Sequence, residues 1–332
     1  MDKVRWGVLS TSGFGLRSMV PALQKSRNAE VRAIASRDAK KAEEAARKAG
    51  IPRWYGSYEE LLESKDIDAI YNPLPNHLHV PWTIAAMKAG KHVLCEKPVS
   101  LTAADVRAMI KVRDRMKVKA GEAFMVRTNP QWLKARDIVK SGGIGGIVSV
   151  TGHFSYFNDD PGNIRNRLEW GGGAMWDIGC YTVTTSRMVL GEEPERVVCV
   201  MEKDPRSGTD ILSSAILDFP SCQAAFTVAT RQASYQRMQF LGTERRLDVE
   251  VPFNAQSDRP NRLFLWNSGI SAEPAEVIEF PVSDQYVIQS EAFSRAILDD
   301  TDVAVPLEDS LKNTAVLEAL FKSARKWKWV SV

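Results

Sequence analysis

A lysine stands at the carboxyl end of a short apolar run, where a ligand could reach it. The sequence Cys95-Glu96-Lys97-Pro98 follows the apolar residues 92–94, and the proline ends the strand that this run predicts. In an open α/β sheet, ligands bind at the carboxyl ends of the strands. Most lysines are ordinary surface residues, so the interpretation of Lys97 depends on the motifs around it. At such an edge its ammonium group could hold a substrate hydroxyl.

An aspartate and a tyrosine in the second half of the chain could complete this chemistry. Asp177 and Tyr181 follow a glycine-rich stretch, residues 171–173, and a polar loop, residues 160–167. On a helix the i,i+4 spacing places both side chains on one face. A buried tyrosine with a capping aspartate is the structural alternative. In the functional interpretation Tyr181 exchanges a proton with a substrate hydroxyl or carbonyl, and a nearby ammonium such as that of Lys97 lowers its pKa by favouring the phenolate.

A serine- and glycine-rich loop joins an expected strand, residues 4–10, to an expected helix, residues 14–26. A dinucleotide-binding loop carries three glycines so that its backbone can approach a pyrophosphate at a helix N-terminus. Only the third, Gly15, is kept here, and serines replace the other two. Small serine side chains still permit close approach, although an ordinary turn has the same composition. The residues expected to contact the cofactor here are Ser10, Thr11, Ser12, Gly13, Phe14 and Gly15.

The end of the second expected strand, residues 30–35, favours NADP over NAD. An acidic residue about 20 residues past the glycine loop binds the ribose 2′-hydroxyl of NAD, whereas an arginine accommodates the 2′-phosphate of NADP. Ser36 and Arg37 occupy that position, and Lys41 follows closely. Asp38 comes slightly late and fits better as a helix N-cap. We therefore expect NADP, with NAD as the less favoured cofactor.

The sequence after the third expected strand, residues 69–72, predicts a rigid turn with two prolines. Residues 72–79 read NPLPNHLH, and the next helix is expected over residues 81–89. The turn backbone could pack on the nicotinamide ribose. His77 or His79 could act as a base, although histidines in a turn more often cap the following helix. The further residues expected to contact the cofactor are Leu74, Pro75, Asn76, His79, Glu96, Lys97 and Arg127.

Two fold types follow one another along the chain. Strands and helices alternate over residues 1–124, which predicts a doubly wound parallel Rossmann sheet. Residues 125–332 are expected to form an α+β domain with a large, mostly antiparallel open sheet and helices over 130–140, 283–298 and 307–326. One face of that sheet could be left to a partner subunit, as in a homodimer or homotetramer. The strands expected in it span 147–157, 196–203, 211–219, 224–231, 235–242, 245–251, 262–266 and 275–280.

Composition excludes several classes of protein. Of the 332 residues 44% are hydrophobic and 26% charged, and the net charge of +3 comes from interspersed acids and bases, so we expect no nucleic-acid partner. The four cysteines and four histidines show no metal-ligand spacing, so no metal is expected. No apolar run approaches the roughly 18 residues of a membrane span. The N-terminus enters a strand without a signal peptide, which predicts a cytoplasmic protein.

Taken together, these motifs resemble the glucose–fructose oxidoreductase/inositol dehydrogenase family of NAD(P)-dependent sugar oxidoreductases, over essentially the whole chain. The resemblance rests on the loop 10–13, the sequence 72–79, Glu96-Lys97-Pro98 and the stretch from Gly171 to Tyr181. Most family members have histidine where Tyr181 stands. Tyrosine is typical of the branch with glucose–fructose oxidoreductase, NADP-dependent D-xylose (aldose) dehydrogenase, dimeric dihydrodiol dehydrogenase and some keto-sugar reductases.

The resemblance implies specific roles. Lys97 and Tyr181 would form the catalytic pair, Asp177 would bind substrate hydroxyls, and Arg37 would hold the 2′-phosphate. The expected reaction transfers hydride from a carbinol carbon of an aldose, C1 in the preferred interpretation, to the nicotinamide, while Tyr181 takes the hydroxyl proton. Arg165 is the further residue expected at the substrate.

Alternatives stay open at this stage. The same pair could run in reverse, in an NADPH-dependent reductase of a keto-sugar, a sugar nucleotide or a dicarbonyl; Arg165 and Arg167 are the candidates for contacting a diphosphate. A catalytically silent NADP-binding sensor is a second alternative. The chain also lacks two features of relatives: an N-terminal arm that wraps the cofactor, which suggests free cofactor exchange, and an aromatic–histidine pair near residues 127–131.

Overall fold

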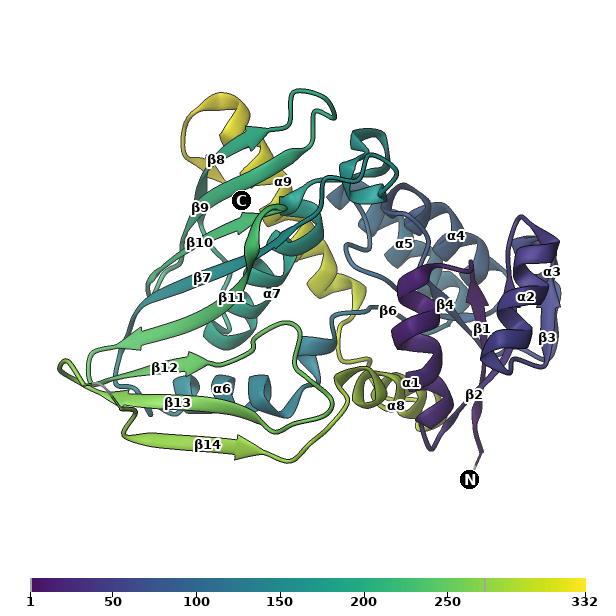
Figure 1. Cartoon of the computed structure of the whole chain (residues 1–332), viewed down its shortest axis with the longest axis horizontal. Coiled ribbons are helices and arrows are strands. Elements are labelled where there is room, and N and C mark those ends of the chain that lie inside the picture. The colour runs from purple at the N-terminus through teal and green to yellow at the C-terminus, as the bar shows by residue number, and fades with distance from the viewer. Residues whose placement is uncertain (1, 272) are drawn as a thin grey trace. The chain divides into compact units, whose positions relative to one another are not determined.

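The computed structural model describes residues 2–271 and 273–332, and the chain divides into two compact units (Figure 1). The first unit comprises Met1–Thr128 and Asp284–Leu311, and the second comprises Asn129–Ser283 and Lys312–Val332. This grouping differs from the sequence-based boundaries, because residues 284–311 join the first unit. Packing explains the difference: on helix α8 (Gln285–Leu298) the Ser294 hydroxyl accepts a hydrogen bond of 3.1 Å from the buried indole of Trp6.

The first unit contains a six-stranded sheet in the order β3-β2-β1-β4-β5-β6, and all its pairs are parallel. This order confirms the predicted doubly wound Rossmann sheet, whose direction of winding reverses between β1 and β4. The edge strand β3 was not predicted, because its side chains are mostly exposed and show no apolar run. The strands are β1 (Val4–Leu9), β2 (Ala29–Ala35), β3 (Arg53–Tyr55), β4 (Ala69–Asn72), β5 (His92–Cys95) and β6 (Ala120–Glu122).

Helices connect these strands, and side-chain caps mark where several begin. The Asp38 carboxylate accepts a hydrogen bond from the amide of Lys41, which confirms the predicted N-cap. At the start of α5 the Thr102 hydroxyl accepts a hydrogen bond of 3.1 Å from the amide of Asp105. The helical segments are η1 (Gly15–Met19), α1 (Val20–Lys25), α2 (Ala39–Ala49), α3 (Tyr58–Glu63), α4 (Asn76–Lys88), α5 (Ala103–Met116) and η2 (Met125–Arg127).

Helix α4 begins at Asn76, so the expectation that it would begin at Pro81 is wrong. Pro75 occupies the N-cap position, and Pro81 lies within the helix. At this interior position proline removes one hydrogen bond to the preceding turn and its ring crowds a carbonyl there, yet the helix continues to Lys88. Asn76 through His79 therefore form the first turn of a helix rather than a loop.

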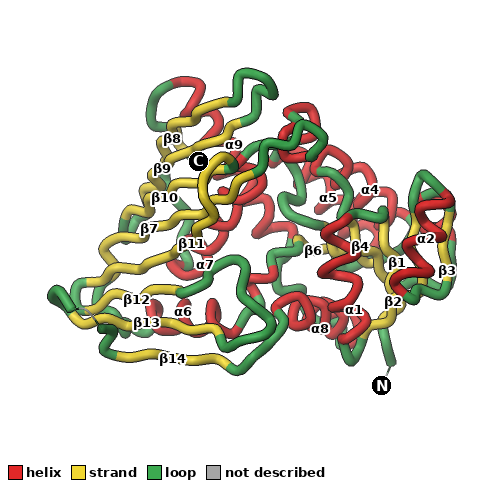
Figure 2. Tube along the Cα trace, viewed as in Figure 1, coloured by secondary structure: helices red, strands yellow, loops and turns green. Residues whose placement is uncertain are grey.

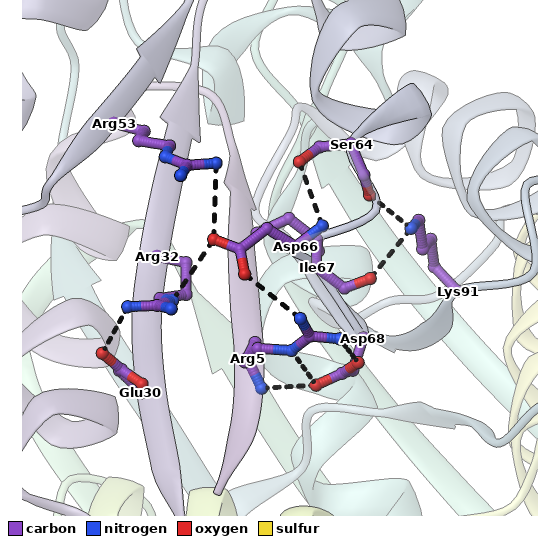
Figure 3. A network of polar contacts seen from close by, with 9 residues as sticks. All are labelled: Arg5, Glu30, Arg32, Arg53, Ser64, Asp66, Ile67, Asp68 and Lys91. Atoms are coloured by element: carbon purple, nitrogen blue, oxygen red, sulfur yellow. Dashed lines mark hydrogen bonds and ion pairs between the residues drawn. The ribbon is translucent and has the colours of Figure 1, made fainter.

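At the amino ends of the strands, charged side chains form a network (Figure 3). Asp66 lies 3.1 Å from Arg5 and 3.4 Å from both Arg32 and Arg53, which come from β1, β2 and β3. Arg5 also donates to both carboxylate oxygens of Asp68, at 2.9 and 2.6 Å. One carboxylate thus ties three neighbouring strands together, at the edge of the sheet opposite the loops that could bind a ligand.

The second unit contains a nine-stranded sheet in the order β14-β13-β12-β11-β7-β10-β9-β8-β15. It is antiparallel except for β7 and β10, which pair in parallel, so the predicted mostly antiparallel sheet is confirmed. The strands are β7 (Ile147–Phe157), β8 (Arg196–Lys203), β9 (Asp210–Asp218), β10 (Gln223–Ala229), β11 (Arg231–Gly242), β12 (Arg245–Val249), β13 (Asn261–Asn267), β14 (Glu276–Phe280) and β15 (Val330–Ser331).

Helices pack on one face of this sheet: α6 (Pro130–Lys140) contacts β12 and β13, and α7 (Cys180–Leu190) contacts β7 (Figure 2). Helix α9 (Leu307–Lys326) begins in the first unit and continues in the second. Within the described residues, none of the helices combines the length and apolar character needed to cross a membrane. The other face of the sheet exposes apolar side chains at Val200, Leu212, Ile216 and Tyr235.

Candidate functional site

The loop after β1 folds as a dinucleotide-type turn although serines replace two of its glycines. Ser10 has φ 82°, in the left-handed region that glycine usually occupies. Its hydroxyl accepts a hydrogen bond of 3.2 Å from the Ser12 amide, and the Ser12 hydroxyl accepts one of 3.1 Å from the Gly15 amide. A Cβ atom at position 15 would stand 2.8 Å from that hydroxyl, so the third glycine is sterically required.

The helix after this loop begins with η1, a π-helical turn, which is often found at functional sites. The amides of Gly13 and Phe14 donate to no acceptor within residues 2–271 and 273–332, so they can face an anion. The guanidinium of Arg17 lies beside them, since a Cβ atom at position 13 would stand 2.8 Å from its Nη1. Sequence analysis missed Arg17, although a cation in the first turn after a glycine loop is a usable signal.

At the end of β2, the three residues predicted to select the cofactor lie near one another. Ser36 is buried, and its hydroxyl accepts a hydrogen bond of 3.2 Å from the amide of Asp38. Arg37 and Lys41 are exposed beyond it. Burial raises the pKa of Tyr58, and the charge of the neighbouring Arg37 opposes that rise. Two exposed cations at this strand end can attract a 2′-phosphate.

His79 lies behind the turn rather than at its surface. It is fully buried, with Nδ1 2.7 Å from the carbonyl of Pro98 and Nε2 2.6 Å from the carbonyl of Leu74. Two carbonyl acceptors favour a doubly protonated ring, but burial is the larger effect and lowers the pKa of His79 to about 4. The side chain joins the turns after β4 and β5, so we assign it a positioning role in place of the predicted contact with the cofactor.

Glu96 organises the carboxyl end of β5. One of its carboxylate oxygens accepts a hydrogen bond of 2.7 Å from the buried Tyr71 hydroxyl, and the other accepts one of 3.3 Å from the Lys97 amide. Burial raises the pKa of Tyr71 well above its ordinary value, so that hydroxyl stays a donor. The Lys97 side chain is half-buried, and the hydrogen bond of the Lys97 amide to Glu96 holds the backbone from which this side chain extends.

Helix α8 adds Tyr286 to the same end of the sheet. Its ring meets Phe14 edge to face, with 5.6 Å between the centroids, and burial and the Glu96 charge raise its pKa. Sequence analysis could not find Tyr286, because no local motif marks it and the rest of this cluster lies far away in the chain. Arg127, the last predicted cofactor contact, forms an ion pair of 3.3 Å with Asp309.

In the second unit, the glycine stretch allows two backbone segments to approach closely. The amide of Gly173 donates to the carbonyl of Arg165 and that of Gly172 to the carbonyl of Arg167, both at 2.9 Å. A Cβ atom at position 172 would overlap the Arg165 carbonyl, and one at 173 would overlap the Asp210 carboxylate. The glycines are therefore needed for close approach, and they fix Arg165 beside the helix that follows.

That helix begins with a second π-helical turn, η5 (Met175–Gly179), and continues as α7. Asp210 holds its start, because one carboxylate oxygen accepts hydrogen bonds from the Met175 amide at 2.7 Å and the Ser213 hydroxyl at 2.8 Å. Burial raises the pKa of Asp210. Sequence analysis missed Asp210, which resembled an ordinary polar residue before a strand.

Asp177 is the centre of a polar cluster in this unit. Its Oδ2 accepts hydrogen bonds from the Tyr156 hydroxyl at 2.6 Å and from Arg165 Nε at 2.8 Å. The charge of Asp177 raises the pKa of Arg165, and Tyr181 lies close enough to add to that effect. The structure therefore brings three predicted residues together, Asp177, Tyr181 and Arg165.

Tyr156 is the member of this cluster that sequence analysis missed. Burial and the Asp177 charge raise its pKa, and the Arg165 and Arg231 guanidinium groups oppose the rise. Tyr181 itself is buried, with its ring 5.5 Å from that of Phe253. A carboxylate with two donors, beside a tyrosine in an apolar setting, can bind a hydroxylated ligand and exchange a proton with it.

Within the described residues, no group of three or more histidine, cysteine, aspartate or glutamate side chains could hold a metal ion. Lys97, Glu96 and the loop of residues 10–15 belong to the first unit, and Asp177, Tyr181 and Arg165 belong to the second. Each unit thus carries one set of the predicted residues.

Two family models match this chain. One, described as an oxidoreductase family with an NAD-binding Rossmann fold, matches residues 4–124, and a GFO/IDH/MocA C-terminal domain matches residues 132–248. An oxidoreductase of Rhizobium meliloti described as uncharacterized is 42% identical over 100% of both chains. An NADP⁺-dependent D-xylose 1-dehydrogenase of Haloferax volcanii is 36% identical over 96% of this chain and 97% of that protein.

A solved structure shows the same fold. A 3-ketoreductase from Actinomadura kijaniata, in complex with NADP and TDP-benzene, superimposes with a TM-score of 0.91 and 28% identity, covering 97% of this chain and 98% of that one. The same ketoreductase has been solved with a tyrosine replaced by phenylalanine, and with a lysine replaced by alanine or glutamate.

Proposed function

This chain belongs to the GFO/IDH/MocA family of oxidoreductases with an NAD-binding Rossmann fold, and on that premise we propose that it is an NADP-dependent sugar dehydrogenase. The family predicted from the sequence motifs is thus confirmed, and the chain is a sugar oxidoreductase. The finer proposal is that it oxidises an aldose at C1. The observation that carries it is the Asp177 carboxylate with its donors Tyr156 and Arg165, beside Tyr181.

Asp177 and Arg165 are proposed to bind the hydroxyls of the sugar. A sugar hydroxyl is both a donor and an acceptor, and this cluster offers a carboxylate acceptor next to a guanidinium donor 2.8 Å away. Hydrogen bonds to charged groups are stronger than neutral ones. The pair can therefore orient a sugar ring so that one carbinol carbon faces the cofactor.

Tyr181 is proposed to take the proton of the reacting hydroxyl, and Lys97 to hold that hydroxyl and favour the phenolate of Tyr181. When bound, the nicotinamide accepts the hydride; the side chains supply orientation and proton transfer. The replaced tyrosine and lysine of the 3-ketoreductase are of the same two residue types. Glu96 supports this role of Lys97 by holding its backbone amide.

NADP is the proposed cofactor. Its pyrophosphate would lie against the loop 10–15, where the amides of Gly13 and Phe14 face outward beside Arg17. Arg37 and Lys41 would hold the 2′-phosphate, which an acidic residue at that position would repel. The xylose dehydrogenase and the 3-ketoreductase are both described with NADP, which supports the same choice here.

The test is the absorbance of reduced nicotinamide with purified protein, NADP⁺ or NAD⁺, and a panel of small aldoses and polyols. We expect a signal with an aldose and NADP⁺. Tyr181→Phe and Lys97→Met should each lower turnover by about 10²–10⁴-fold, and Tyr181→Phe should do so with little change in cofactor affinity. Tyr235→Phe, an exposed tyrosine on the sheet, is the matched control. Full activity of Tyr181→Phe would show that its assigned role is wrong.

The second candidate is an NADPH-dependent reductase of a keto-sugar or sugar nucleotide, favoured by the similarity to the 3-ketoreductase. It uses the same residues with Tyr181 as the proton donor. Oxidation of NADPH by a keto-sugar, with no signal from any aldose, would favour it over the dehydrogenase.

We also propose that copies of the chain associate through the outer face of the nine-stranded sheet. Apolar side chains at Val200, Leu212, Ile216 and Tyr235 are exposed on that face, and such surfaces are typical of interfaces. Light scattering on the purified protein tests this. Ile216→Lys should shift the mass towards that of a monomer.

A further inference from the structure

A polar cavity of about 300 Å³ lies within the second unit, at the end of the sheet near the β8–β9 turn. Three arginines and three carboxylates line it: Arg167, Arg206, Arg231, Asp159, Glu169 and Asp204. The volume falls at the lower end of the range for small-molecule pockets, about 300–1,000 Å³. The proposed dehydrogenase assigns no role to these residues; only the alternative sugar-nucleotide reductase uses one of them, Arg167.

Two of its lining residues, Arg231 and Asp204, form an ion pair. Arg231 Nη2 donates to Asp204 Oδ2 at 3.0 Å, and Asp204 Oδ1 accepts a hydrogen bond of 2.7 Å from the amide of Arg206. The other terminal nitrogen, Arg231 Nη1, is buried and has no hydrogen-bond partner within the described residues. A buried donor without an acceptor is costly, and Arg231 is one of the residues that line the cavity.

The lining indicates an uncharged, hydroxylated ligand. Guanidinium donors and carboxylate acceptors are equal in number around the cavity. A hydroxyl uses both kinds of partner, whereas a phosphate or carboxylate would be repelled by Glu169 and Asp159. A purely apolar ligand would displace water from these ion pairs without offering a hydrogen bond in return.

The cavity is linked to the Asp177 cluster by residues that neighbour its members. Asn166 and Arg167 line it, and they follow Arg165, which binds Asp177 at 2.8 Å. On the other side, Arg231 lies near Tyr156, the second donor to Asp177. A sugar bound at Asp177 would therefore have this cavity beside it.

We propose that the cavity is an outer subsite for a second sugar ring of the substrate, so that the enzyme acts on the reducing ring of a disaccharide or longer glycan. This inference rests on the proposed function, because it extends the same site. Arg231 and Asp204 form its rigid floor, and Glu169 and Arg206 contact ring hydroxyls from the rim.

The kinetic test compares kcat/KM for cellobiose and glucose, and for xylobiose and xylose, with NADP⁺. In the pair that contains the better monosaccharide substrate, the wild type should have a higher kcat/KM for the disaccharide than for the monosaccharide. Glu169→Gln and Arg206→Gln alter exposed side chains, so the fold is retained, and each should lower the disaccharide-to-monosaccharide ratio roughly tenfold. Arg259→Gln, an exposed arginine outside the cavity, should leave the ratio unchanged. Equal ratios in all four proteins would overturn the subsite.

Calorimetric titration of the NADP⁺ complex separates failure of the subsite from failure of the proposed function. Disaccharide binding that weakens in Glu169→Gln and Arg206→Gln, without turnover, would reject the dehydrogenase and keep the subsite. Inorganic pyrophosphate is the probe for an anionic ligand. Binding of pyrophosphate that strengthens in Glu169→Gln and weakens in Arg206→Gln would overturn the proposal in favour of a phosphorylated substrate.

Discussion

The Tyr156 hydroxyl donates a hydrogen bond of 2.6 Å to the Asp177 oxygen that also accepts Arg165 Nε at 2.8 Å. Strand β7 supplies the tyrosine and the 3₁₀ turn η3 (Ile164–Asn166) the arginine, so two separate segments fix one carboxylate. A carboxylate held from two directions is oriented before any ligand arrives, which lowers the entropy cost of binding.

Tyr156→Phe should weaken sugar binding more than it slows chemistry. Asp177 keeps its bond to Arg165 but loses one donor, so its orientation loosens. We expect KM for the sugar to rise roughly tenfold, the effect of one hydrogen bond to a charged group, with kcat within about threefold of the wild type. Steady-state kinetics measure both. A fall in kcat of a hundredfold at unchanged KM would instead place Tyr156 in the proton transfer.

Arg37→Gln should change the choice of cofactor. Loss of one charge-assisted contact to the 2′-phosphate should lower kcat/KM for NADP⁺ by about 10- to 100-fold and leave that for NAD⁺ nearly unchanged. Arg47→Gln, an exposed arginine on helix α2, which follows Arg37, is the control. A wild-type protein that uses NAD⁺ alone would remove the role given to Arg37.

The stability of the first unit should fall in acid because of His79. Burial lowers its pKa from 6.5 to about 4, so the unfolded chain takes up a proton at a higher pH than the folded one. The contribution of His79 is complete above pH 6.5 and is lost as the pH falls towards 4, by about 3 kcal/mol in total. Urea unfolding across this range measures it.

His79→Gln should be less stable at pH 7 and should lose less stability between pH 6.5 and 4 than the wild type. His77→Gln, at an exposed neighbour, should keep the wild-type slope. If the Pro98 and Leu74 carbonyls instead kept the ring protonated at neutral pH, His79 would cause no fall in the stability of the wild type between pH 6.5 and 4.

The network around Asp66 should contribute to stability in a salt-dependent manner. Asp66→Asn leaves Arg5, Arg32 and Arg53 close together without the shared carboxylate. We expect a loss of about 1–2 kcal/mol at low salt, which shrinks in 1 M salt as the repulsion is screened. Glu30→Gln, which removes a more exposed carboxylate paired only with Arg32, should cost less than about 0.5 kcal/mol. Denaturant unfolding at two salt concentrations compares the variants.

Local patterns predicted both sheets but not the short strands β3 and β15, because only strands with buried side chains carry a clear apolar pattern. The apolar run before Lys97 predicted a strand in this way. The helix that Asp38 caps was likewise predicted from a local signal. The start of α4 could not be predicted from two prolines alone, because each is compatible with a turn or with the first residues of a helix. For the site, sequence motifs were enough to single out residues such as Lys97 and Tyr181. Tyr156, Asp210 and Tyr286 could not be predicted, because they act through contacts between distant segments that no spacing reveals.

The discontinuous first unit has a consequence for how the chain matures during synthesis. Trp6 and Phe14 lie at its beginning, yet their partners Ser294 and Tyr286 are translated only after eight of the nine strands of the other sheet, β7 to β14. The nucleotide-binding unit therefore cannot complete its core while only its first 128 residues have left the ribosome. A fragment ending there would expose the surface that α8 covers, so the two units must mature together rather than in sequence.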